Sequence, residues 1–334
     1  MWSRRLVLAL LAGLALAGCG SATVRTTAAP VSARGFARWS AFAHLRRPLD
    51  LVGPLHDGAL VLAADGRLWT FQRSGAVSRL APAYASPGGE EPYIALAAAG
   101  RPGCSFGPDT VYALRLGGPG RGVVAVSAAG RVRQLAHVSA PGLLDGIAFD
   151  DTGSFGHKLL VTVNAGSRTT VLAIDCHGTV RTITGRAPRV EGAIAVAPAG
   201  FGRFAGDLIA PDETSGRIFA ITPQGQSVLV ARSDLPHGQD VGVESEAFVR
   251  AGWSAFVADR LTPGNPHPGD DLVLRLSAAA LRGQGVRAGD LLAVTEGGAL
   301  VDDVACGSRG CRVREVATGP RVAHVEGHVA FAPF

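Results

Sequence analysis

Residues 207–230 decide the fold. Asp207-Leu208-Ile209-Ala210 is followed by Arg217-Ile218-Phe219-Ala220-Ile221, the turn Pro223-Gln224-Gly225, and Ser227-Val228-Leu229-Val230. Short apolar runs separated by loops and a glycine turn predict consecutive antiparallel strands. An acidic residue and a further apolar run, Glu191-Gly192-Ala193-Ile194-Ala195-Val196, precede them. Together these segments predict a unit of four short strands.

The same unit recurs along the chain, and most copies begin about 45 to 57 residues apart, the length of one β-propeller blade. Further strand pairs are Val111–Leu114 with Val123–Val126, Leu159–Val163 with Val171–Ile174, and Ala255–Ala258 with Leu272–Leu276. The acidic residues that open the copies are Glu91, Asp145, Glu191, Glu244 and Glu326, with a weak copy at Asp302.

These repeats predict an all-β fold, a β-propeller over residues 41–334 with four short antiparallel strands per blade. We expect six blades, with five or seven left open. Only 24 residues separate Asp302 from Glu326, so the closing blade must take strands from the N-terminal part. A parallel α/β sheet would need helices of about 10 residues or more between strands. The one candidate, Ala278–Leu281, is too short.

The N-terminus predicts export and lipid anchoring. Arg4 and Arg5 precede the apolar run Leu6–Leu16, which is shorter than the roughly 20 residues of a membrane-spanning helix. Leu16-Ala17-Gly18-Cys19 resembles the lipobox of bacterial lipoproteins, which implies that residues 1–19 are a signal and that Cys19 is lipidated. The alternative is an ordinary secretory signal cut later in the chain. Residues 20–40 then form a flexible tether that holds the domain at the extracytoplasmic face of the cell membrane.

The amino-acid composition limits the classes of molecule that the protein is expected to bind. The formal charge of the 334-residue chain is +5, and almost all its basic residues are arginines scattered along the sequence, with Lys158 the one lysine. Because no basic stripe with aromatic residues is present, we expect no nucleic-acid binding. Hydrophobic residues make up 47% of the chain, which excludes a disordered protein. We expect a monomer.

The four cysteines after Cys19 predict two disulfides, since their number is even and exported proteins fold in an oxidising compartment. Cys306 and Cys311 enclose a four-residue turn, and Cys104 and Cys176 remain to pair with each other. Within the predicted propeller, Cys104 follows an inner strand and Cys176 lies between the third and fourth strands of the next blade. Both therefore fall on the same face of the disc.

The acidic residues should converge on the opposite face. In an antiparallel blade, the start of the inner strand and the end of the second strand lie on one face of the disc. Five carboxylates at one mouth repel one another unless a cation neutralises them, and calcium accepts six to eight oxygen ligands. The alternative is that each acid bonds neighbouring backbone amides. The candidate metal ligands from these two kinds of position are Glu191, Asp145, Asn164, Asp212 and Asp259.

Two histidines fall in loops on the same predicted face. His237 lies in the connection from one blade to the next, and His267 lies in a long loop between a second and a third strand. Either could act as a general base, because the unperturbed pKa of histidine is about 6.5. The alternative is that both are surface loop residues. His324 and His328, which flank Glu326, are expected to pack around the channel.

The segment from Val190 to Pro198, followed by Asp207–Glu213 and Gly216–Ile221, resembles blades of NHL-type and gluconolactonase (regucalcin-like) propellers. In that family a divalent metal at the channel mouth is held by a glutamate, an asparagine and an aspartate, and polarises a lactone for hydrolysis. The resemblance implies that the positions of the right type and face here are Glu191, Asn164, Asp212 and Asp259.

Two functions remain open at this point. The first is a membrane-anchored lipoprotein whose propeller face binds a protein, a glycan or a small molecule, with a calcium ion as a structural plug. The second is a metal-dependent lactonase or esterase in which His237 or Asp259 is the base. The sequence contains no Gly-x-Ser-x-Gly elbow, phosphate-binding loop, His-Glu-x-x-His motif or dinucleotide fingerprint. Serine hydrolase, nucleotide-driven and zinc-peptidase chemistries are therefore unsupported.

Overall fold

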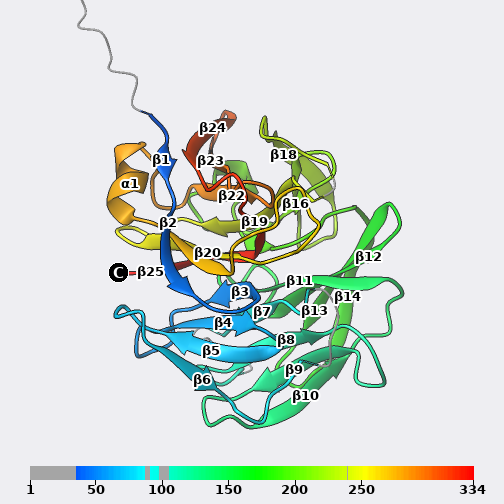
Figure 1. The fold of residues 1–334 in the computed structure, drawn as a ribbon. Coiled ribbons are helices and arrows are strands. Elements are labelled where there is room, and N and C mark those ends of the chain that lie inside the picture. Colours follow the sequence, from blue (N-terminus) through cyan, green and yellow to red (C-terminus); the bar gives the residue numbers. More distant parts are fainter. Residues whose placement is uncertain (1–34, 87–90, 98–104, 239) are drawn as a thin grey trace, which may run out of the picture. The chain divides into compact units, whose positions relative to one another are not determined.

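The computed structural model describes residues 35–86, 91–97, 105–238 and 240–334. The strands of these residues form six sheets, arranged as the blades of a propeller (Figure 1). Five sheets have four strands and one has five. The all-β prediction and the count of six blades are confirmed. The signal, Cys19 and most of the predicted tether lie outside the described residues.

The first four blades are each built from consecutive strands that run from the channel outward. Blade 1 comprises β3 (Pro48–Val52), β4 (Leu60–Ala64), β5 (Arg67–Phe71) and β6 (Val77–Leu80), and blade 2 comprises β7 (Ile94–Leu96), β8 (Val111–Arg115), β9 (Gly122–Val126) and β10 (Val132–His137). Blade 3 comprises β11 (Leu143–Phe149), β12 (Leu159–Ala165), β13 (Arg168–Ile174) and β14 (Val180–Pro188). Blade 4 comprises β15 (Ala195–Val196), β16 (Leu208–Asp212), β17 (Arg217–Ile221) and β18 (Ser227–Arg232).

Blades 5 and 6 are interleaved. The chain forms the inner strand of blade 5, crosses to blade 6, returns to blade 5, and ends with the inner strand of blade 6. Blade 5 comprises β19 (Val243–Phe248), β22 (Leu291–Thr295), β23 (Val301–Gly307), β24 (Gly310–Thr318) and, parallel to β24, β1 (Ala37–Arg38). Blade 6 comprises β25 (Val325–Ala332), β20 (Ser254–Asp259), β21 (Leu272–Leu276) and β2 (Ser40–His44).

This arrangement corrects two sequence assignments. By sequence order, Ala255–Ala258 and Leu272–Leu276 belong to the blade that opens at Glu244, but these strands pair with β25 in blade 6. Asp302 does not open an inner strand, because it lies in β23, the third strand of blade 5. β19 and β20 are adjacent in sequence but lie in different blades, since the last strand must close the ring. The expectation that the closing blade takes a strand from the N-terminal part is confirmed by β2.

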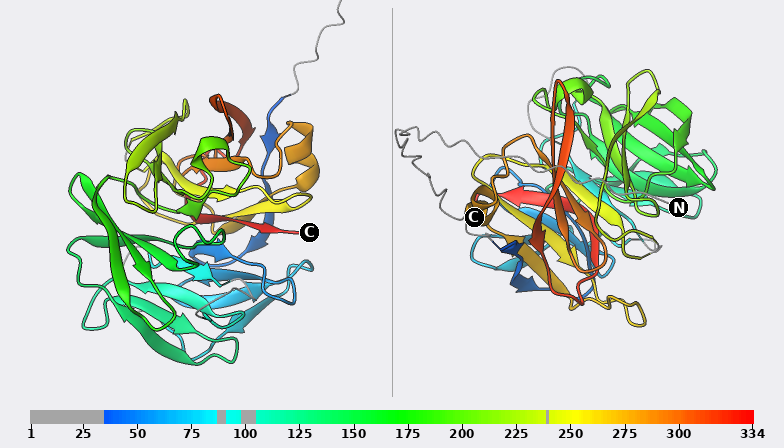
Figure 2. Two further views of the ribbon diagram at one scale, coloured as in Figure 1. Left: turned by 180° about the vertical axis from the view of Figure 1, so that it is seen from behind. Right: turned by 90° about the horizontal axis from the view of Figure 1, so that it is seen from above.

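The N-terminal strands begin at Ala37, inside the segment predicted as tether. β1 adds to the outer edge of blade 5 and β2 to the outer edge of blade 6, so this short segment joins the two interleaved blades (Figure 2). Phe42 of β2 packs on Phe71, Phe256 and Phe334, with ring centroids 5.2 to 6.0 Å apart. The N-terminal segment is therefore part of the propeller core.

The remaining non-strand elements are small. Among the described residues, the helices are α1 (Ala278–Gly283), between β21 and β22, and the 3-10 turn η1 (Gly202–Phe204). Ser277 caps α1 by accepting a hydrogen bond from the Ala280 amide. Within this part of the chain, no helix is long and apolar enough to span a membrane.

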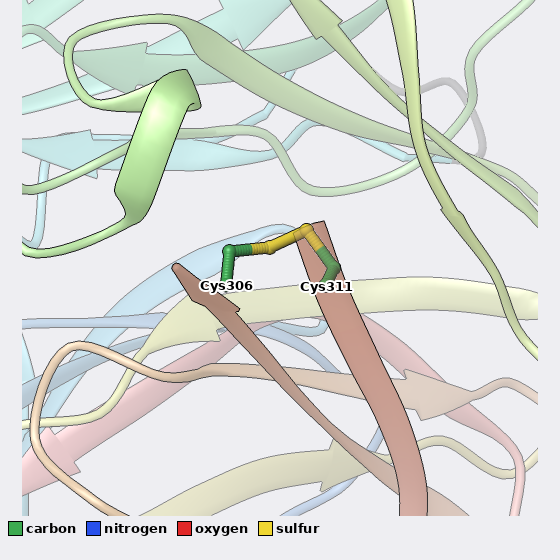
Figure 3. Close-up of a disulfide and its surroundings, with 2 residues drawn as sticks. All are labelled: Cys306 and Cys311. Carbon is green, nitrogen blue, oxygen red and sulfur yellow. A yellow bond between two sulfur atoms is a disulfide. The ribbon is translucent and has the colours of Figure 1, made fainter. Parts of the chain in front are cut away.

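A disulfide joins Cys306 and Cys311 across the β23–β24 hairpin, where the two residues are directly opposite partners with Cα atoms 4.0 Å apart (Figure 3). This confirms the predicted bridge. Cys176 lies in the turn between β13 and β14 and is also disulfide-bonded. Cys104 lies outside the described residues, so its pairing with Cys176 stays a prediction.

Replacement of Phe42 by alanine tests the N-terminal closure. Because the ring contacts aromatic side chains of two blades, we expect Phe42→Ala to cost about 2 to 3 kcal/mol and to lower the melting temperature by several degrees. The matched control is Phe36→Ala, at a side chain that is 51% exposed. Equal melting temperatures for the two variants, measured by circular dichroism, would contradict a role for β2 in closing the ring.

Candidate functional site

One mouth of the central channel is acidic. The starts of the inner strands bring Glu91, Glu244 and Glu326 together, and Glu296 follows β22, the second strand of blade 5. Their carboxylates lie in two compact groups that share Glu326. Within the described residues, the ligand atoms of each group lie within 4.8 Å of one another: Glu91, Glu244 and Glu326 in one group, and Glu296, His324 and Glu326 in the other. We call this end of the channel the acidic mouth.

Tyr93 links two of these carboxylates. Its hydroxyl oxygen lies 2.5 Å from Oε1 of Glu244 and 3.2 Å from Oε2 of Glu326, and all three side chains are buried. The hydroxyl carries one proton, so it can donate to only one carboxylate at a time. The second contact therefore requires a proton on the other carboxyl group or a cation beside it.

His324 joins the second group. Its Nε2 atom is 3.0 Å from Oε1 of Glu296 and 3.1 Å from Oε1 of Glu326, so one ring nitrogen faces two carboxylates. Glu296 in turn shares a side-chain hydrogen bond with Glu213, the residue after β16. A hydrogen bond between two carboxyl groups needs a shared proton. The acidic mouth thus extends as a continuous chain of carboxyl groups from blade 2 to blade 4.

The cations at this mouth are few. Arg260 donates to Oε1 of Glu326 at 3.1 Å, and Arg189 pairs with Glu191. Within the part of the chain that the structure describes, no ion pair joins an arginine to the Glu91, Glu244 or Glu296 carboxyl group. Mutual repulsion in a buried setting favours the neutral acids.

The pKa values follow this electrostatic situation. Burial, reinforced by the charge of Glu326, raises the pKa of Glu91 and of Glu244 well above the ordinary range. Burial and the neighbouring Glu326 and Glu213 raise the pKa of Glu296 to about 10. Burial raises the pKa of Asp145 to about 8. Burial and mutual repulsion therefore favour the protonated forms of these groups.

Close backbone approach assembles the mouth. Gly192 has a φ of +85°, and a Cβ atom at this position would lie 2.3 Å from the backbone oxygen of Glu244. The amide of Ala193 donates to that same oxygen. Any larger residue at position 192 would push the inner strands of blades 4 and 5 apart. The glycine that follows Glu191 at the start of blade 4 is therefore required for steric reasons.

The predicted metal ligands Asp145 and Asn164 belong to one hydrogen-bond network. The Asn164 amide donates to Asp145 and to the Val190 carbonyl, and its Oδ1 accepts from Thr169 at 2.6 Å. Asp145 also accepts from the Gly192 amide at 3.0 Å. These contacts tie blade 3 to blade 4, and they use the polar atoms that a cation would need.

The other predicted residues lie around the acidic groups and not within them. Glu191 pairs with Arg189, and Asp212 accepts from the Ser215 hydroxyl. Asp259 accepts from the His324 amide at 2.9 Å, so it positions His324 through its backbone. The Nδ1 atom of His237 faces the Leu235 carbonyl at 3.3 Å, a local loop contact. Their binding or catalytic roles stay predictions.

Sequence reasoning missed Glu296, and the reason is specific. Glu296 follows a second strand, as Asp212 ends one, and this position rule was already in use. By sequence order the second strand of this blade is Ala255–Ala258, whereas in the structure it is β22. Tyr93 lies in the repeat that opens at Glu91, but its hydroxyl reaches Glu244, 151 residues away, only in the closed ring.

A pocket of about 280 Å³ adjoins the acidic mouth. Its lining includes Pro92, next to Glu91, and Arg260, the partner of Glu326. Arg47 and Arg67 also line it, together with Tyr84. Three arginines around one pocket favour an anionic or strongly polar guest.

No protein-family model matches the chain, and no curated protein matches it significantly. Solved structures that it resembles include a Bacteroides thetaiotaomicron protein of unknown function (TM-score 0.50, 12% identity, 87% of this chain and 66% of that one). A second is catalytically inactive virginiamycin B lyase from Staphylococcus aureus with quinupristin (TM-score 0.49, 13% identity, 88% of this chain and 95% of that one). A third is a protein proposed to be a gluconolactonase (TM-score 0.38, 14% identity, 72% of this chain and 92% of that one).

The resemblance shows the propeller fold. At identities this low the likeness concerns the arrangement of blades alone.

The acidic mouth predicts a pH dependence of stability. Carboxyl groups with raised pKa values bind more protons in the folded than in the unfolded state, so stability falls as pH rises above about 4.3, the unfolded value of glutamate. With a chelator present, we expect the melting temperature to decline between pH 5 and pH 8, and Glu296→Gln to flatten that decline. An unchanged slope in Glu296→Gln would show that Glu296 is not a source of the effect.

Proposed function

We propose that the protein is an extracytoplasmic lipoprotein that binds a calcium ion at the acidic mouth and uses this face of the propeller to bind a small ligand or a protein partner. The observation that carries the proposal is the group formed by Glu91, Glu244 and Glu326, whose carboxylate oxygens lie within 4.8 Å of one another. The ion would act as a structural plug between blades 2, 5 and 6.

The spacing of this group fits calcium. Calcium binds oxygen at about 2.3 to 2.6 Å, so two ligands of one ion can be up to about 4.6 to 5.2 Å apart. Magnesium, at about 2.0 to 2.1 Å, requires a tighter octahedron. The donors are hard oxygen atoms, with the Tyr93 hydroxyl beside them. Because the pKa values of Glu91 and Glu244 are raised, a divalent cation would compete with protons for these carboxyl groups.

The arginine-lined pocket supports a polar or anionic small-molecule ligand. Arg260 connects this pocket to the ion site, because it lines the pocket and also donates to Glu326. A ligand carboxylate or hydroxyl there would lie next to a bound cation. Glycans and lactone-derived acids both offer such groups.

A metal-dependent lactonase or esterase is the second candidate. A bound divalent cation would supply Lewis-acid polarisation of a carbonyl group. Asp259 favours this candidate: burial raises its pKa to about 6, and its Oδ2 atom is buried with no hydrogen-bond partner among the described residues. Such a carboxyl group is poised to accept a proton near neutral pH.

The calcium proposal is tested by calorimetric titration of calcium into chelator-treated protein. We expect one ion per chain, proton release near neutral pH, and at least tenfold weaker binding in Glu244→Gln. The matched control, Glu315→Gln, changes a glutamate in the outer strand β24 and should bind calcium like the native protein. Equal binding by all three proteins, or no binding at all, would contradict the proposal.

The same samples separate the two functions. Loaded and chelated protein are assayed on a panel of lactones and esters, and thermal shifts are measured with the corresponding acids. Turnover that requires the ion and is lost in Asp259→Asn would favour the hydrolase. Stabilisation by acids without turnover would favour the binding protein.

Cys19→Ala tests the anchor. Because acyl chains supply the membrane affinity, we expect the full-length variant, expressed in a bacterial host, to lose palmitate labelling and to move from the membrane to the soluble extracytoplasmic fraction. The control is Cys306→Ala, which removes a cysteine of the propeller disulfide and should leave labelling intact. Palmitate labelling that persists in Cys19→Ala would place the lipid elsewhere.

A further inference from the structure

The channel end opposite the acidic mouth opens into a cavity of about 560 Å³. Six blades contribute to it through the later residues of their inner strands. One lining residue from each blade, in order from blade 1, is Val52, Leu96, Ala148, Ala195, Ala247 and Ala330. The lining is mainly apolar, and its volume lies within the roughly 300 to 1,000 Å³ typical of small-molecule sites.

A fully partnered polar pair closes the floor of this cavity. The Nδ1 atom of His328 lies 3.0 and 3.1 Å from the two carboxylate oxygens of Asp50, which also accept hydrogen bonds from the amides of His328 and Ile94. The His328 side chain is hydrogen-bonded to the Ile147 backbone as well. The floor thus offers no unmatched charge to a guest.

Apart from His328, the polar side chains of the lining belong to the loops that follow the inner strands, at the outer end of the cavity. His56 and Asp109 pair with each other there, and Thr152 and Arg250 also line the opening. A guest could therefore place a polar group only at the outer end. Its inner part would contact the apolar walls.

We propose that this cavity binds a small, predominantly apolar molecule whose polar group, if it has one, faces the rim. Water in contact with these walls is unfavourable by about 25 cal/mol per Å² of apolar surface, and an apolar guest removes that cost. A charged inner end is disfavoured because Asp50 and His328 already satisfy each other. The site is separate from the acidic mouth and does not depend on a metal there.

The test uses the fluorescent naphthalene 1-anilinonaphthalene-8-sulfonate, whose apolar rings and single charged end match this description. We expect saturable binding of one probe per chain with a negative heat-capacity change. Ala195→Phe and Ala247→Phe, which fill the cavity from two different blades, should each weaken binding at least tenfold. The matched control, Ala129→Phe, lies in an exposed turn and should bind like the native protein.

Two further measurements keep the result interpretable. Cooperative thermal unfolding of each variant shows that it is folded, and either cavity variant alone suffices if the other fails to fold. Glu244→Gln should bind the probe normally even if it loses calcium, so failure at one channel end is distinguishable from failure at the other. Probe binding that is non-saturable, or unchanged in a folded cavity variant, would overturn the proposal.

Discussion

The pairing of β25 with β20 is the interaction on which the rest of the structure depends. Blade 6 is assembled from three separate parts of the chain: the last strand, the hairpin β20–β21, and β2 near the N-terminus. None of these parts can bury its faces until the others arrive, so the blade forms only when the ring closes. The view from behind shows β25, in red, between the yellow strands and blue β3 (Figure 2).

Closure by β25 also builds both ends of the channel. This strand carries Glu326, which is common to both compact acidic groups, and His328, which pairs with Asp50. Between them, Gly327 has a φ of +68°, and a Cβ atom there would lie 2.5 Å from Oδ1 of Asp50. The last strand therefore packs closely against β3 at Gly327, with Glu326 of the acidic mouth and His328 of the apolar cavity on either side of this contact.

The channel is divided into two chemical environments. On one side, burial and mutual repulsion disfavour the charged forms of the crowded carboxyl groups and raise the pKa values of Glu91, Glu244 and Glu296. On the other, apolar walls surround a floor whose ion pair is already satisfied. Although burial opposes the charged imidazole, the Asp50 carboxylate and the Ile147 backbone raise the pKa of His328. The Asp50–His328 pair is therefore the boundary between the two environments.

The sequence by itself determined the local strand pattern, the repetition of a four-stranded unit, the Cys306–Cys311 hairpin disulfide and the convergence of acidic residues on one face, while it left the number of blades at five, six or seven. Each follows from spacing within one blade, where strand direction alternates and neighbours in sequence are neighbours in space. Only the tertiary structure decided that Glu296 and His324 join the acidic groups, that Asn164 donates to Asp145, and that Asp50 pairs with His328. Those contacts arise because the two ends of the chain meet where the ring closes. Asp50 and His328 are 278 positions apart in the sequence and become partners only in the closed ring, so no local sequence pattern reveals their contact.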